Sequence, residues 1–162
     1  PTELDDEWND SHEFVSGATS FFDGKANTKA MAEAGSTLAK QVLGLNINGR
    51  NDWYIPSRDE LELCYRNLKP GTRKNYCYRG DNPSSIPPGY AYTPDTPAQT
   101  SAELFTEDAS EAFDLDWYWT STQGAAFPDY AWMQGFNDGN QDDYHKSSSC
   151  RARAVRRVLI IE

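Results

Sequence analysis

The chain has 162 residues, enough for one domain with a substantial core. Its formal net charge of -10 argues against a nucleic acid or an anionic membrane surface as partner, and no apolar run of about eighteen residues predicts membrane insertion. The three cysteines fit neither a disulfide framework nor a zinc site. We expect free thiols, with a Cys64–Cys77 pair as the alternative in an oxidising compartment. Without a starting Met or a secretory signal, the chain is expected to be processed or cut from a longer protein.

The first half of the chain predicts two helices. Residues 1–23 are acidic and aromatic, and we expect part of them to be a connector. Apolar residues at helical spacing predict one amphipathic helix over 27–43 that closes near Gly44, and residues 52–56 predict a short strand.

The second helix has the strongest local signal. Ser57 and Glu60 form a capping box, in which each side chain satisfies a free backbone N–H group of the other residue. The helix is expected to end at 69–71 and to bury a stripe made of Leu61, Cys64, Tyr65 and Leu68.

The second half predicts a long loop and then strands. Residues 70–100 are rich in Pro and Gly and predict an ordered loop-rich insertion anchored by its tyrosines, Tyr76, Tyr78, Tyr90 and Tyr92. A short helix is expected within 101–113, and strands are expected at 117–122, 130–136 and 151–161. The chain therefore predicts a single α+β domain over 1–162, with two main helices, a small antiparallel sheet and a long insertion.

Between residues 130 and 157 two kinds of residue alternate. Bulky or long residues form a framework that includes Trp132, Gln134, Phe136, Gln141, Lys146 and the block 151–157. Between them lies a polar set, made of Gly135, Asn137, Asp138, Asn140, Asp142, Asp143, Tyr144, His145, Ser147, Ser148, Ser149 and Cys150. A framework punctuated by small polar residues is what a binding surface needs, and it is not the pattern of a catalytic site.

Several motifs together resemble a known family. The motifs are the WYIPSRDEL run at 53–61, the YWTSTQ run at 118–123, Ala131-Trp132, and the RARAVRR run at 151–157. This set resembles the C-terminal domain family of the Legionella collagen-like adhesin, and in particular its branch among the variable proteins of diversity-generating retroelements. The resemblance covers nearly all of residues 24–158. It implies a C-type lectin fold.

In that branch, as the resemblance implies, template adenines are mutated and AAY codons become any NNY codon. Such codons do not encode Trp, Met, Gln, Lys or Glu, and the polar set contains none of these residues. The resemblance therefore implies that residues 135–150, here named the display segment, carry variable ligand-binding positions. The scaffold is expected to include Trp119, Trp132, Gln134, Phe136 and Arg153.

Alternation along the strand at 130–136 predicts how this segment is built. Trp132 and Phe136 are expected on one side as core anchors, with Gly135 and Asn137 pointing outward. Tyr144 is the best candidate for an energetic hot spot, since Tyr is enriched among such residues. The implied ligand is a bacterial cell-surface receptor, protein or glycan, bound by a homo-oligomer such as a trimer in a phage tail tip or fibre. A bacterial surface protein is the alternative location.

Other functions stay open at this stage. The oxygen-rich stretch 137–143 is compatible with calcium but lacks the spacing of an EF-hand loop, so no cofactor or metal is expected. Formylglycine-generating enzymes have a related fold but use a late cysteine pair, whereas Cys150 stands alone, so we expect no enzyme. An invariant adhesin that binds polyanionic glycans, or a structural virion protein, remains the alternative within the same fold.

Overall fold

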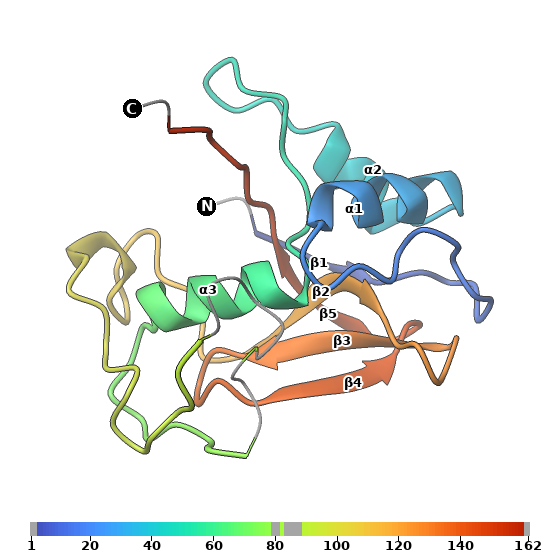
Figure 1. Cartoon of the computed structure of the whole chain (residues 1–162). Helices are drawn as coiled ribbons and strands as arrows, with labels where there is room; N and C mark the ends of the chain where they lie inside the picture. Colours follow the sequence, from blue (N-terminus) through green and yellow to red (C-terminus); the bar gives the residue numbers. More distant parts are fainter. Residues whose placement is uncertain (1–2, 79–81, 83–88, 161–162) are drawn as a thin grey trace.

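A five-stranded sheet with the order β1-β5-β2-β3-β4 forms the centre of the fold (Figure 1). The computed structural model describes residues 3–78, 82 and 89–160. Its strands are β1 (Glu3–Glu7), β2 (Trp117–Gln123), β3 (Tyr130–Gly135), β4 (Gln141–His145) and β5 (Ser149–Arg153). The β2–β5 pair is parallel and the others are antiparallel, so the sheet is mixed rather than wholly antiparallel. The predicted α+β class is confirmed, and the architecture is consistent with a small lectin-like domain.

The predicted helix over 27–43 is two helices, α1 (Gly24–Glu33) and α2 (Thr37–Leu43). The chain breaks at Gly35, whose φ of 105° lies in the left-handed region. Ser36 then starts α2, because its hydroxyl accepts a hydrogen bond from the Ala39 N–H and donates one to the Trp8 carbonyl. Helix α1 packs against β2 and α2 against β1.

Helix α3 (Arg58–Leu68) begins with the predicted capping box, which is confirmed. It lies along the sheet against β2 and β3, away from α1 and α2 (Figure 1). Leu61 and Tyr65 are fully buried, whereas Cys64 and Leu68 are only half-buried. Two apolar clusters thus pack against the sheet. One gathers around Trp119 under α1 and α2, and the other gathers around Phe136 under α3.

Three other predicted elements are shorter than expected. Residues 52–56 form no strand, since only Tyr54 makes an isolated bridge, to Val155. The helix expected within 101–113 is one 3₁₀ turn, η1 (Glu103–Phe105). The strand expected at 151–161 ends at Arg153, because beyond it the chain finds no neighbouring strand and only the Val155 bridge remains among the described residues.

The loop-rich insertion lies partly outside the described residues. In the part that is described, Tyr92 is buried and donates a hydrogen bond to Glu62 Oε1 at 2.6 Å. Tyr78 is 86% exposed, so it is not the anchor that was expected. Lys69 and Asn75 hold the loop instead: the Lys69 ammonium contacts Asn75 Oδ1 at 2.8 Å, and both side chains donate to the Pro97 carbonyl.

The N-terminal region, expected to be partly a connector, contributes strand β1 and the fully buried Trp8. The acidic start of the chain contacts its basic end, because Glu3 of β1 lies 3.2 Å from Arg151. All three cysteines are free thiols. No helix in the described part of the chain is long and apolar enough to cross a bilayer.

Candidate functional site

Burial divides the display segment into the two predicted sets. Framework residues Gln134, Phe136, Gln141 and Lys146 are all fully buried. Every residue of the polar set except Gly135 is half-buried or exposed. The segment therefore consists mainly of strand β4 and two flanking turns. Its buried framework side chains are spaced between the polar residues and anchor the segment to the core.

The first turn, at 136–140, is held by Gln134 and Gly139. The Gln134 amide donates to the Gly139 carbonyl at 3.1 Å. Gly139 has a φ of 78°, and a Cβ there would lie 2.3 Å from Cε1 of Tyr65. Gly139 is thus a framework position that the sequence pattern did not identify.

The second turn, at 146–148, is held by a buried lysine. The Lys146 ammonium donates to Gln123 Oε1 at 2.6 Å and to the Glu13 carbonyl at 3.0 Å, and it lies 4.6 Å from the centre of the Trp8 ring. Burial lowers the pKa of Lys146 to about 8. Lys146 therefore joins the display segment to the N-terminal region and to β2.

Strand alternation sends the side chains of β4 to opposite faces of the sheet. Asp143 pairs with Trp132, and Asp142 pairs with Met133. Trp132 lies on the α3 side, where the Arg58 guanidinium covers its ring at 4.2 Å. Trp132 is half-buried, so it is less deeply placed than the core anchor that was expected, whereas Phe136 and Trp119 are fully buried.

Gly135 is buried, so it is less exposed than the outward position that was expected. A Cβ at this position would lie 2.7 Å from Asn137 Oδ1, the end of a flexible side chain, and 3.6 Å from the Trp117 ring. Position 135 thus accepts a side chain once Asn137 moves.

The face opposite α3 carries a hollow of about 440 Å³, here named the sheet hollow. It is lined from all five strands, by Asp5, Asp116, Trp117, Met133, Asp142, Tyr144, Ser149, Cys150 and Arg151. Four of these residues, Asp142, Tyr144, Ser149 and Cys150, belong to the predicted polar set. The others were not identified from the sequence, because they come from strands that pairing alone brings to the hollow.

Charge in the sheet hollow is dominated by carboxylates. Arg151 donates to Asp116 at 3.1 Å and contacts Asp114 at 2.7 Å and Glu3 at 3.2 Å. The hydrogen bond to Asp116 and the charges of Asp114 and Glu3 raise the pKa of Arg151. Burial, followed by the charges of Asp116 and Asp5, raises the pKa of Cys150 to about 12. Cys150 is therefore a neutral thiol at pH 7 and not an activated nucleophile.

A model of the Lcl C-terminal domain family matches residues 6–156, which is most of the chain. The chain belongs to the Lcl C-terminal domain family. No curated protein and no solved structure matches it. Family membership favours an adhesin-like or other binding domain.

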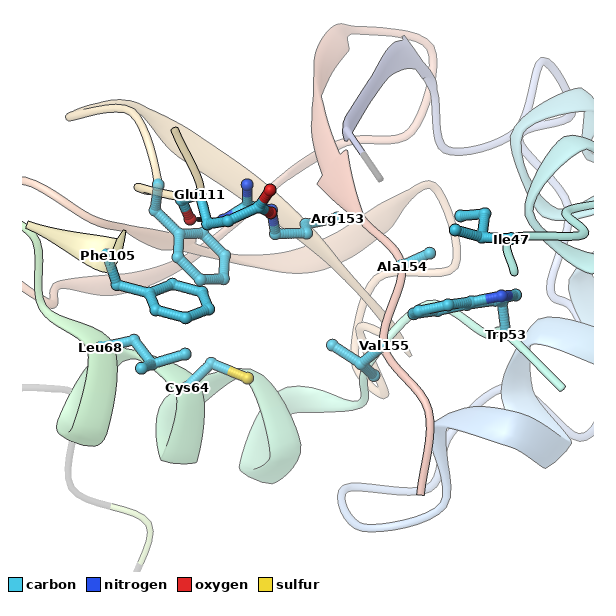
Figure 2. Close-up of a pocket in the computed structure, with 10 residues that line it drawn as sticks. Ile47, Trp53, Cys64, Leu68, Phe105, Glu111, Arg153, Ala154 and Val155 are labelled. Carbon is cyan, nitrogen blue, oxygen red and sulfur yellow. Dashed lines mark hydrogen bonds between the residues drawn. The ribbon is translucent and has the colours of Figure 1, made fainter. Parts of the chain in front are cut away.

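This Lcl C-terminal domain has a second concavity, of about 400 Å³, outside the display segment. Figure 2 shows Leu68 and Phe105 on one side, Ile47 and Trp53 on the other, and Val155 between them. Its lining is mainly apolar and half-buried, and none of it comes from residues 135–150.

The histidines of the Lcl C-terminal domain are brought together at the second turn. The rings of His12 and His145 lie 4.7 Å apart, and His145 Nδ1 lies 2.8 Å from Ser147 Oγ. His145 Nε2 is 3.6 Å from Asp129, so an ion pair forms when His145 is protonated. Among the described residues, no group of three or more His, Cys, Asp or Glu side chains is arranged to hold a metal ion.

Proposed function

We propose that this Lcl C-terminal domain is a non-catalytic ligand-binding domain that recognises its partner through the sheet hollow and the turns around it. The observation that carries the proposal is the separation of roles within the display segment. Its framework side chains, Phe136, Gln141 and Lys146, are fully buried, and its polar residues other than Gly135 are half-buried or exposed. Replacing the outward residues therefore removes little of the apolar burial that stabilises the fold.

The proposal includes diversification of the polar positions in residues 135–150 by a retroelement. Two features support it: the absence from the polar set of the residues that NNY codons do not encode, and the family match. The proposed setting is a phage tail tip or fibre, with a bacterial surface protein as the second setting. There a homo-oligomer such as a trimer binds a bacterial cell-surface receptor, which is a protein or a glycan.

The first experiment compares replacement of outward and inward residues. A variant with serine at Asn137, Asp142, Tyr144 and Asp143 is expected to keep its free energy of unfolding within about 1 kcal/mol of the parent. The control, Gln141→Ser, removes the acceptor of the Arg58 Nε–H at 3.1 Å. It is expected to cost about 1–3 kcal/mol, because it removes a hydrogen bond to a charged group from a fully buried position. Equal losses in the two variants would contradict the separation of roles.

The second experiment tests diversification directly in the gene. We expect a near-copy of the segment that encodes residues 131–157, differing at adenines, beside a reverse-transcriptase gene. Sibling clones should differ at the polar positions and agree at Gln134, Phe136, Gln141 and Lys146. An identical display segment in all siblings would favour the second candidate function, an invariant adhesin or a structural virion protein.

A further inference from the structure

The sheet hollow has an apolar floor that the predicted variable residues do not supply. Trp117 and Met133 are half-buried on this face, and the 52% exposed Tyr144 stands at the rim. Trp117 and Met133 come from the centre of the sheet, where neighbouring strands fix the backbone. The floor is therefore preformed, as is usual for a small binding site.

The rim of the hollow carries more negative than positive charge. Three carboxylates, Asp5, Asp116 and Asp142, line the hollow together with one cation, Arg151. Arg151 is shared further with Asp114 and Glu3, which lie next to the hollow. The local charge is therefore negative, as is the charge of the whole chain.

We propose that the sheet hollow receives a lysine or arginine side chain of a protein partner. This inference rests on the proposed binding function and specifies the chemistry that the surface recognises. The aliphatic stem of the side chain packs on Met133, and its cationic group lies against Trp117 or Tyr144 with Asp142, which shares a face of β4 with Tyr144, beside it.

Physical chemistry favours a cation over other groups. An aromatic face attracts an ammonium or guanidinium group through its quadrupole, and nearby carboxylates add direct attraction. An anionic group is repelled by the same carboxylates. A purely apolar group covers the floor but leaves the rim carboxylates partly desolvated without a compensating charge from the ligand.

The test uses capped amino acids with the intact chain. N-acetyl-arginine amide and N-acetyl-lysine amide are titrated while the indole N–H signals of the tryptophans are followed by nuclear magnetic resonance. The Trp117 signal is expected to move in a saturable way. The signal of Trp8, which is fully buried elsewhere, is the internal control and is expected to stay in place. N-acetyl-citrulline amide has the shape of the arginine probe without its charge and is expected to bind more weakly.

Matched variants test the face of the sheet. Asp142→Asn should weaken binding of the arginine probe about two- to fivefold, the usual size of an exposed charge pair. Asp143→Asn removes the same charge one residue further along β4, on the opposite face, and should have little effect. Both positions are half-buried and both substitutions keep the size of the side chain, so both variants are expected to fold.

The results distinguish failure of the cation proposal from failure of the proposed binding function. Equal binding of the citrulline and arginine probes, equal effects of the two Asn variants, or no movement of Trp117 with any cationic probe would overturn the cation proposal. These results leave the proposed binding function standing if the serine variant keeps its stability and sibling clones vary. Loss of stability in the serine variant together with invariant siblings would instead remove the proposed function.

Discussion

The two glycines at 135 and 139 lie in the same turn region and have opposite tolerances for a side chain. Gly139 combines a left-handed backbone with a Tyr65 ring that occupies the space of a Cβ. Gly135 lacks a positive φ, and the nearest obstacle to its Cβ is the movable Asn137 amide. A position can vary only where both the backbone and the space permit it, so residue type alone does not separate display from framework.

This difference predicts the effects of two alanine substitutions. Gly139→Ala is expected to lower the free energy of unfolding by about 2–4 kcal/mol, because it adds left-handed strain to overpacking against Tyr65. Gly135→Ala is expected to change it by less than about 1 kcal/mol. Urea denaturation of both variants measures the difference. An unchanged midpoint for Gly139→Ala would contradict the placement of the Tyr65 ring over this turn.

At the scale of secondary structure, elements with local signals were predictable and elements that depend on distant partners were not. The capping box at Ser57 and the aromatic run of β2 are local sequence signals, so α3 and the central strand could be predicted. Strands β1 and β4 are short and acidic, and in isolation they resemble a connector and a solvated loop. Each becomes a strand because a partner, β5 or β3, supplies its backbone hydrogen bonds.

Deletion of residues 1–7 tests whether β1 is part of the folded domain. The deletion removes the Asp6 carbonyl that accepts from Trp119 Nε1 at 3.2 Å, and it removes Glu3 from beside the buried Arg153. We expect a loss of at least about 3 kcal/mol, since a buried guanidinium is left with less compensating charge. Asp5→Asn keeps the strand and is the matched control, with an expected change under about 1 kcal/mol. Thermal unfolding that is unchanged by the deletion would make β1 a connector after all.

At the scale of the whole molecule, the sheet hollow is a product of topology. The polar positions of the display segment were anticipated from their spacing, but the floor that they surround was not. Trp117 and Met133 carry no binding signal in the sequence, and Asp5 is separated from Asp142 by most of the chain. Strand pairing in the order β1-β5-β2-β3-β4 brings them to one hollow. Sequence patterns thus identified which residues of this segment lie outside the core, and strand pairing determined which of them line one hollow.

Lys146 makes the stability of contacts between distant parts of the chain depend on pH. It ties the second display turn to the N-terminal region and to β2, and burial lowers its pKa to about 8, from an ordinary 10.5. Between about pH 8 and 10.5 the unfolded chain therefore binds more protons at this residue than the folded chain does. In this window the stability contributed by Lys146 should rise with pH, by at most roughly 3 kcal/mol.

The measurement is the difference in unfolding free energy between the parent chain and Lys146→Met across this pH range. Subtraction cancels the titration of groups that both proteins share, so the remaining slope belongs to residue 146 and its contacts. Lys29 is 74% exposed and lies 3.9 Å from Glu33 of its own helix, so Lys29→Met is the matched control for removing a lysine charge at the surface. A flat difference for Lys146→Met would mean that the ammonium keeps its charge when buried. The hydrogen bonds to Gln123 and Glu13 and the Trp8 ring would then offset the desolvation cost without loss of the proton.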